Sequence, residues 1–328
     1  MLWLVLIACG GGVDPSRGST EAVRHRTLTL AAYTTPREAY GRAVLPAFAA
    51  HWRRKTGEEV TFEASYQGSG AQARAVAGGL EADVVALSLE PDVQVLVDAG
   101  LITRDWKSEA VEGMVTRSLV VLAVRPGNPK GIREWGDLAR ADVEVVTPDV
   151  RTSGGAIWNV AALWGGALRS GLDEAGAESL LAGVLGRVRV MDKGARESIT
   201  TFEKGVGDVA ITYENEVLVA RAEGRAMEYV VPRATIRIDN PVAVVDTYAR
   251  KHGNIELAEE FVRFLVTPEA QAAFVEHGLR PVVGDAPPTL PVPEVLFTVA
   301  DLGGWSSVKG TLLGETGVYA RALAKGRP

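Results

Sequence analysis

The feature of this sequence that most limits its possible folds is the alternation, from Thr27 onward, of short β-branched runs with stretches of helical spacing. The helical stretches carry apolar residues four positions apart, as in Tyr40, Val44, Phe48 and Trp52. This alternation predicts an α/β fold in which helices cover central sheets. The candidate strands are Thr27 to Tyr33, Val60 to Ser65, Asp83 to Ser88, Ser118 to Val124, Val143 to Thr147, Arg187 to Met191, Asp208 to Tyr213, Met227 to Val231 and Val242 to Val245.

The length and composition narrow the class of protein further. A chain of 328 residues fits about two domains, each able to bury its own core. The 35 basic and 41 acidic residues give a net charge of −6, which disfavours a nucleic-acid partner because phosphate binding normally needs a basic face. No apolar run approaches the ~20 residues of a spanning helix, so we do not expect a polytopic membrane protein.

The extreme N-terminus has the character of an export signal. Apolar residues 2–8 lead into Cys9, and the glycine-rich residues that follow are typical of a flexible tether. The segment Leu6-Ile7-Ala8-Cys9 resembles the lipobox of bacterial lipoproteins, which implies lipidation at Cys9 and a periplasmic or cell-surface location. Because no Lys or Arg precedes the apolar run, we suspect an upstream start codon; a stray buried cysteine is the alternative.

Four segments share one design, in which a strand ends in small or hydroxyl residues that open a helix. The first turn of a helix has free backbone N–H groups, cap hydroxyls add donors, and glycine lets a ligand approach the backbone. Such donors, converging from several helix starts, are typical of a small-anion site. The segments are Tyr33-Thr34-Thr35-Pro36-Arg37-Glu38, Gln67-Gly68-Ser69-Gly70, Thr152-Ser153-Gly154-Gly155 and Lys193-Gly194-Ala195-Arg196.

Other chemistries find less support in the sequence. A P-loop and a dinucleotide-binding glycine turn are both missing, so nucleotide binding is not expected. Ser69 and Ser153 have neither a Gly-x-Ser-x-Gly elbow nor an evident base, and Asp83 and Asp208 are explained as turn residues before strands. The single cysteine and four histidines show no metal-ligand spacing. We therefore predict no catalytic residue, no metal and no cofactor.

Over about residues 27–281 the sequence resembles the periplasmic sulfate-binding proteins of ABC importers. This resemblance implies the two-lobed type II periplasmic binding protein fold, with a central mixed sheet flanked by helices in each lobe and a ligand cleft between the lobes. In that family, neutral donors alone hold the sulfate. The blocks that carry the resemblance are Pro36-Arg37-Glu38-Ala39-Tyr40, Gly68-Ser69-Gly70-Ala71-Gln72-Ala73, Gly79-Leu80-Glu81-Ala82-Asp83-Val84-Val85, Arg125-Pro126-Gly127-Asn128-Pro129-Lys130-Gly131, Thr152-Ser153-Gly154-Gly155-Ala156-Ile157-Trp158-Asn159, Gly194-Ala195-Arg196, Gly207-Asp208-Val209 and Tyr213-Glu214-Asn215-Glu216.

The same resemblance implies which groups bind the anion. They are the amide of Thr34, the hydroxyls of Ser69 and Ser153, the amides of Gly154, Gly155 and Ala195, and the side chain of Tyr213.

Three positions depart from the family pattern. Thr34 replaces a common aspartate, a mild change for a backbone contact. Tyr213 stands where the family usually has tryptophan, and a phenol can accept as well as donate. Glu197 follows Arg196 where glycine is common, and its carboxylate either accepts a proton from a ligand or pairs with Arg196. We predict that Tyr213 and the pair Arg196 and Glu197 affect which anion is selected.

The candidate ligands differ in whether they carry a proton near neutral pH. Sulfate offers only acceptors, whereas phosphate carries a proton near neutrality and needs an acceptor, for which Glu197 and Tyr213 are candidates. We predict sulfate, with thiosulfate as a second ligand; phosphate, molybdate or tungstate is the alternative, and a secreted ester hydrolase a more distant one. If neutral donors alone bind it, sulfate affinity is expected to be nearly flat between about pH 6 and pH 8.

The predicted domain organisation follows from the same resemblance. Residues 1–26 form the signal and tether, residues 27–116 and 244–328 form lobe one, and residues 117–243 form lobe two, with the crossing strands as a hinge. Closure is expected to bring Thr34 and Ser69 against the donors of lobe two. We expect a monomer that passes its ligand to the membrane subunits of an ABC importer.

Overall fold

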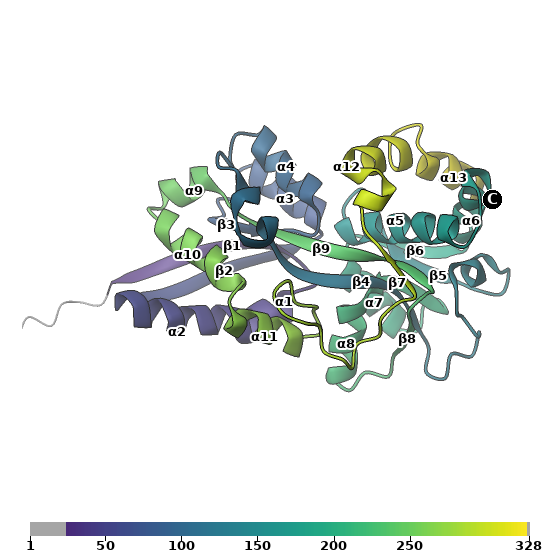
Figure 1. Cartoon of the computed structure of the whole chain (residues 1–328), viewed down its shortest axis with the longest axis horizontal. Coiled ribbons are helices and arrows are strands. Elements are labelled where there is room, and N and C mark those ends of the chain that lie inside the picture. Colours follow the sequence, from purple (N-terminus) through teal and green to yellow (C-terminus); the bar gives the residue numbers. More distant parts are fainter. Residues whose placement is uncertain (1–23, 327–328) are drawn as a thin grey trace, which may run out of the picture.

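Two long strands, β4 (Met114–Val124) and β9 (Ala234–Val244), run antiparallel from one lobe of the molecule into the other (Figure 1). The structure, a computed structural model, describes residues 24–326, so Cys9 lies outside the described residues. Both strands are rich in buried apolar side chains, as expected for strands covered on both faces. They connect the two lobes of an α/β fold, which confirms the predicted fold class.

The sheet has the strand order β2-β1-β3-β9-β4-β7-β5-β6, with β8 beside β4 and β10 beside β9. In the first lobe β1 is parallel to β2 and β3, whereas β3 is antiparallel to β9. In the second lobe β5 is parallel to β6 and β7, and β7 is antiparallel to β4. The other strands are β1 (His25–Tyr33), β2 (Glu59–Gln67), β3 (Val84–Ala86), β5 (Val145–Pro148), β6 (Val188–Asp192), β7 (Val209–Tyr213), β8 (Glu228–Val230) and β10 (Val295–Phe297).

Aromatic packing holds the helices of the first lobe to its sheet. Phe48 is fully buried and meets Phe261 edge-on, with ring centroids 4.9 Å apart. Buried Asp83 accepts hydrogen bonds from the Thr29 amide and the Asn254 side chain and also contacts His252. The helices here are α1 (Arg37–Ala39), η1 (Tyr40–Val44), α2 (Leu45–Thr56), α3 (Ser69–Ala77), α4 (Glu90–Asp98), η2 (Trp106–Ser108), η3 (Ala110–Gly113), α9 (Asp246–Lys251), α10 (Ile255–Leu265) and α11 (Pro268–Glu276).

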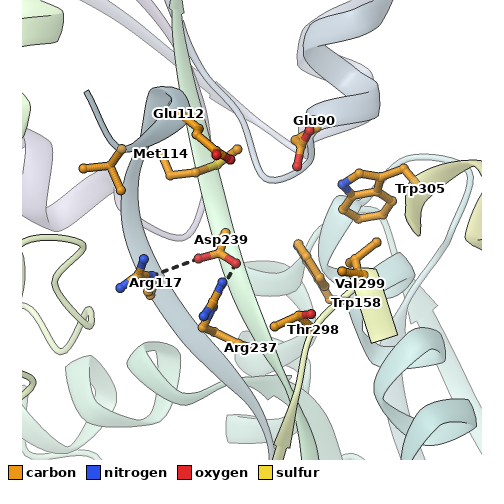
Figure 2. Close-up of a pocket in the computed structure, with 12 residues that line it drawn as sticks. Glu90, Glu112, Met114, Arg117, Trp158, Arg237, Asp239, Thr298, Val299 and Trp305 are labelled. Carbon is orange, nitrogen blue, oxygen red and sulfur yellow. Dashed lines mark hydrogen bonds and ion pairs between the residues drawn. The ribbon is translucent and has the colours of Figure 1, made fainter. Parts of the chain in front are cut away.

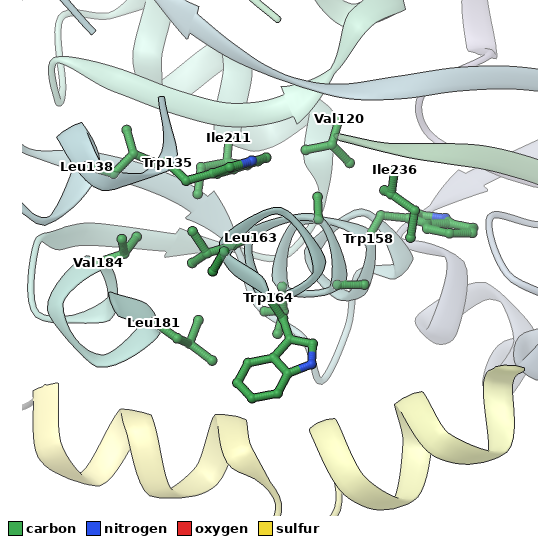
Figure 3. Close-up of a cluster of buried hydrophobic side chains, with 14 of the residues drawn as sticks. Val120, Trp135, Leu138, Trp158, Leu163, Trp164, Leu181, Val184, Ile211 and Ile236 are labelled. Carbon is green, nitrogen blue, oxygen red and sulfur yellow. The ribbon is translucent and has the colours of Figure 1, made fainter. Parts of the chain in front are cut away.

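The second lobe is built around α5 (Gly154–Arg169), which is buried along most of its length (Figure 3). Trp135 packs beside it and donates from its indole N–H to the Ala234 carbonyl at 2.9 Å. The remaining helices are η4 (Trp135–Ala139), α6 (Glu174–Leu185), α7 (Ala195–Glu203), α8 (Glu214–Ala222), η5 (Ala300–Leu302), α12 (Gly304–Ser307), η6 (Val308–Leu312) and α13 (Val318–Gly326).

Each predicted strand has a counterpart in the structure, but two stretches of strand were missed. The prediction began the last crossing strand at Val242, whereas β9 begins at Ala234. The sequence Asp239-Asn240-Pro241 is typical of a turn. In the structure, however, Pro241 lies inside β9 opposite Met114, next to a shift in the β4–β9 register. The short strand β10 was also missed, because its three residues carry too little pattern.

The end of the chain differs from the predicted domain division. Residues 244–328 were expected in lobe one, and α9, α10 and α11 do pack there. Residues 295–326 instead lie on lobe two, where α13 packs against α6 and Phe297 joins the core around α5. Figure 1 shows α12 and α13 above α5 and α6. The physical reason is the apolar side of this segment, with Val308, Leu312 and Val318 buried against lobe two.

Candidate functional site

The four segments that we predicted as anion-binding loops meet between the lobes. A Cβ atom built on Gly68 would lie 2.5 Å from the carbonyl oxygen of Thr152 and 2.8 Å from that of Lys193. The amide of Ala71 donates across the same boundary to the Thr152 carbonyl at 3.3 Å. Only glycine fits at position 68, because its neighbours there are backbone atoms that cannot move aside.

Tyr213 lies beside the helix start at Gly154 and Gly155. A Cβ atom on Gly155 would lie 2.8 Å from Cε2 of Tyr213 and 3.1 Å from Cβ of Ala195. On Gly154 it would lie 2.6 Å from the hydroxyl oxygen of Ser88. The predicted donors of lobe two are therefore neighbours, and the paired glycines let the chain approach Ser88 and Tyr213 closely.

The segment at Thr34 closes the other side of the site. Thr34 follows β1 and is buried, and a Cβ atom on Gly194 would lie 3.7 Å from its hydroxyl oxygen. The helix after Thr34 begins at Arg37, and Pro36 is its N-cap residue. The structure thus brings together every residue predicted as an anion ligand.

The helix starts supply backbone donors, as predicted. Gly154 and Gly155 are the first residues of α5, and Ala195 is the first residue of α7. N–H groups in a first helical turn have no intrahelical acceptor. Ser153 occupies the N-cap of α5, is 3% exposed, and makes no side-chain capping bond. The Ser153 hydroxyl therefore makes no hydrogen bond to the helix that it precedes.

Ser69 differs from the expected simple donor. Its hydroxyl oxygen accepts the Ser88 amide at 2.8 Å and lies 2.5 Å from Oδ2 of Asp92, to which it donates. Burial raises the pKa of Asp92 to about 6, although Ser69, Arg74 and Lys309 oppose the shift. Sequence reasoning missed Asp92, because an acidic residue in the first turn of a helix is ordinary.

The phenol of Tyr213 is held by a second serine that the sequence did not point to. Its oxygen lies 2.6 Å from the hydroxyl oxygen of Ser88, and both side chains are buried. The indole N–H of Trp158 reaches the carbonyl and hydroxyl oxygens of Ser88 at 3.0 and 3.2 Å. Burial raises the pKa of Tyr213 well above its ordinary value, so the phenol keeps its proton. Ser88 and Tyr213 form a direct bond between the lobes.

Arg196 also joins the lobes, and it does so without Glu197. Its guanidinium donates to both oxygens of Glu38 at 2.7 and 2.9 Å and to Glu216 at 2.6 Å. Burial alone would lower the pKa of Arg196, but Glu216 and Glu38 outweigh it and raise that pKa. The alternative in which Arg196 pairs with Glu197 is therefore wrong.

The carboxylate of Glu197 instead lies beside Gly194, close to the predicted anion-binding segments. Its Oε2 atom is buried without a hydrogen-bond partner, and a Cβ atom on Gly194 would overlap it. This carboxylate stands on the α7 side of the donors, near Ala195. Its position fits the predicted role in selectivity.

A cavity of about 460 Å³ lies over the crossing strands β4 and β9 (Figure 2). Arg117 and Arg237 share the carboxylate of Asp239 on its floor, and Trp158 and Trp305 form one wall. Trp158 lines this cavity and also donates to Ser88, which contacts Tyr213. Within residues 24–326, no cluster of His, Cys, Asp and Glu is suited to hold a metal, and no helix is long and apolar enough to cross a membrane.

Comparison with known proteins places these features in context. Residues 28–280 match the family described as bacterial extracellular solute-binding protein. A protein named sulfate-binding protein from Synechococcus elongatus is 44% identical over 323 residues, which cover 96% of this chain and 91% of that one. A thiosulfate-binding protein from Pseudomonas aeruginosa is 34% identical, covering 84% and 85% of the two chains. The solved structure of the sulfate-binding protein SubI from Mycobacterium tuberculosis superposes with a TM-score of 0.77 at 37% identity, covering 87% and 98%.

Proposed function

This chain belongs to the bacterial extracellular solute-binding protein family, and from that premise we propose that it captures sulfate, with thiosulfate as a second ligand, between its two lobes. Its relatives include proteins named for binding sulfate and thiosulfate. The observation that carries the proposal is the convergence of uncharged donors from the segments at Thr34, Ser69, Gly154 and Ala195 with the phenol of Tyr213.

Direct hydrogen bonds would provide most of the binding energy in such a site. Stripping a dianion of water costs tens of kcal/mol by continuum estimates for a dry interior. A helix dipole contributes only ~0.3–2 kcal/mol, whereas a hydrogen bond to a charged partner contributes roughly 1.5–3 kcal/mol. Several neutral donors acting together are therefore needed, and they hold a fully ionised oxyanion without a cation in contact.

We further propose that the protein acts as a monomeric receptor and not as an enzyme. It would deliver the anion to the membrane subunits of an ABC importer, which would recognise the surface formed when the lobes meet. A lipid at Cys9 would hold it at the outer side of the membrane, where a diacylated cysteine anchors firmly.

Calorimetric titration of the purified protein with sulfate, thiosulfate, phosphate and molybdate tests the ligand. We expect sulfate and thiosulfate to bind and phosphate to bind much more weakly, because the backbone donors match an anion without protons. If phosphate binds more tightly than sulfate, the sulfate proposal fails, and the unpartnered carboxylate of Glu197 and the phenol of Tyr213 are the candidate acceptors for its proton.

The variant Ser153→Ala tests the site itself. It removes one neutral donor at the start of α5 and should weaken sulfate binding by about 1 to 3 kcal/mol, the usual loss for one bond to a charged partner. Ser179→Ala, on the exposed face of α6, is the matched control and should bind as the unmodified protein does. Unchanged affinity in Ser153→Ala would remove Ser153 from the proposed site.

A further inference from the structure

The cavity over β4 and β9 has a floor of two arginines and one aspartate. Arg237 and Asp239 are two residues apart on β9, so their side chains lie on the same face of the sheet, and the register places Arg117 of β4 opposite Asp239. The Nε atoms of Arg117 and Arg237 each donate at 2.9 Å to a different oxygen of the Asp239 carboxylate (Figure 2). One carboxylate therefore fixes two guanidinium groups at this cavity.

The rest of each guanidinium is available to a ligand. Within residues 24–326, the terminal nitrogens of Arg117 and Arg237 form no hydrogen bond and no ion pair. The two side chains are 30% and 37% exposed, so a ligand can reach them. A guanidinium binds a carboxylate or another oxyanion through two parallel N–H groups. Because two arginines share one aspartate, this end of the cavity carries an excess positive charge and suits an acid group.

The other end of the cavity carries a free carboxylate. Figure 2 shows Glu112 on the side of the cavity away from Arg237. Glu112 is exposed and has no partner among the described residues, whereas Glu90 is paired with Lys107. The φ angles of Val111 and Glu112 are 56° and 54°, in the left-handed region that a valine rarely adopts. Such strained backbone is found at ligand clamps, and here it holds a negative charge at the cavity.

An apolar wall joins the two charged ends. Trp305 is partly exposed and packs edge-on against Trp158, with ring centroids 5.0 Å apart. Val299 lines the cavity beside them. The volume of about 460 Å³ lies within the range of small-molecule pockets, ~300–1,000 Å³. The cavity is thus large enough for a molecule with an apolar body between two charged groups.

We propose that this cavity binds a small zwitterion of the amino-acid type, as a second ligand site separate from the oxyanion site. Its acid group would lie on Arg117 and Arg237, its ammonium group would face Glu112, and its apolar side chain would pack on Trp305. The two arginines balance Asp239 and Glu112 in charge, so a ligand that is itself neutral leaves no charge uncompensated. The inference goes beyond the proposed function and does not depend on it.

The competing interpretation is a solvated ion cluster that only links β4 to β9. That interpretation explains the bonds to Asp239 but gives no role to the free terminal nitrogens of the arginines or to the strained backbone at Glu112. A purely anionic ligand fits less well, because Asp239 and Glu112 would both repel it. A purely cationic ligand would be repelled by the arginines in the same way.

Titration with L-phenylalanine, followed by tryptophan fluorescence and by ligand-observed NMR, tests the proposal. We expect saturable binding with a dissociation constant below about 5 mM, as for a small ligand of ordinary efficiency. Two analogues each lack one charge: 3-phenylpropionate has no ammonium group and phenethylamine has no acid group. Each should bind at least about fivefold more weakly than L-phenylalanine, because one end of the cavity is left without its partner.

Two variants assign the charged ends. Glu112→Gln should weaken L-phenylalanine about three- to tenfold and leave 3-phenylpropionate unchanged or bound more tightly, because only the ammonium group needs this carboxylate. Arg237→Gln should weaken both ligands about tenfold. Glu63→Gln, which changes an exposed carboxylate on β2 outside the cavity, is the control and should bind as the unmodified protein does. Opposite responses of the two ligands to Glu112→Gln cannot come from misfolding.

Three results would overturn the proposal. They are no saturable binding of L-phenylalanine up to about 10 mM, equal binding of L-phenylalanine and 3-phenylpropionate, and binding that neither Glu112→Gln nor Arg237→Gln changes. Sulfate titration of the same samples keeps the two sites distinct. Sulfate binding without L-phenylalanine binding removes this inference alone, whereas L-phenylalanine binding without oxyanion binding removes the proposed function alone.

Discussion

At the scale of single residues, the site depends on which way each buried hydroxyl points. Ser88 accepts from the Trp158 indole at 3.2 Å and lies 2.6 Å from the Tyr213 phenol. With one lone pair taken by Trp158, Ser88 can donate to Tyr213, and the phenol then keeps its own proton for an anion. Ser88 is thus placed to orient the phenol of Tyr213.

Removal of the phenolic hydroxyl tests this arrangement. Tyr213→Phe keeps the ring against Gly155 but deletes the donor, and we expect sulfate affinity to fall by about 1 to 2 kcal/mol. Titration calorimetry together with a thermal unfolding curve distinguishes lost binding from lost folding. Full sulfate affinity in a folded Tyr213→Phe would show that the phenol does not touch the anion.

At the scale of elements, α5 serves both the site and the core of lobe two. Its first turn supplies Gly154 and Gly155 to the site, whereas Gly165 and Gly166 further along let other elements pack closely. A Cβ atom on Gly165 would overlap the ring of Phe297 in β10. The C-terminal segment therefore docks on α5 through a contact that needs glycine.

We expect Gly165→Ala to loosen that docking. Overpacking against buried Phe297 should lower the free energy of unfolding by about 1 to 3 kcal/mol, despite the better helix propensity of alanine. Denaturant unfolding measures this loss. Gly41→Ala is the matched control, because an added Cβ atom there meets nothing within 4 Å and should be neutral or slightly stabilising. Equal stability of the two variants would contradict the packing argument.

At the scale of the whole molecule, polar contacts hold the two lobes together in addition to the crossing strands β4 and β9. Glu38 of the first lobe and Arg196 of the second form a two-point ion pair with side chains only 15% and 19% exposed. Arg42 and Glu223 form a second pair at 3.0 Å, with side chains 64% and 32% exposed. Solvent screening makes the exposed pair the weaker of the two.

The buried pair is therefore expected to control how long an anion is retained. Glu38→Gln should speed sulfate dissociation roughly tenfold, equivalent to about 1.4 kcal/mol lost from the state in which the lobes touch. Stopped-flow mixing measures the rate, and small-angle scattering follows the separation of the lobes. Glu223→Gln, which weakens the exposed pair, should change the rate by less than about threefold. A larger effect in Glu223→Gln than in Glu38→Gln would reverse this ranking.

The sequence by itself determined the class of fold and the place of the candidate site, because both follow from local residue patterns. Strand-to-helix transitions with small and hydroxyl residues at Thr34, Ser69, Ser153 and Ala195 marked the candidate segments, and the structure brings these positions together. Residues 295–326 were assigned to the wrong lobe, because their apolar side does not say which surface it will cover.

Only the tertiary structure decided which groups the donors meet. Asp92 and Ser88 carry no motif, yet each lies within hydrogen-bond distance of a predicted ligand, Ser69 and Tyr213 respectively. The partners of Arg196 come from another element and the other lobe. Hydrogen-bond direction and proton affinity depend on atoms distant in sequence that folding places within 3 Å of one another, and local residue patterns do not contain that information.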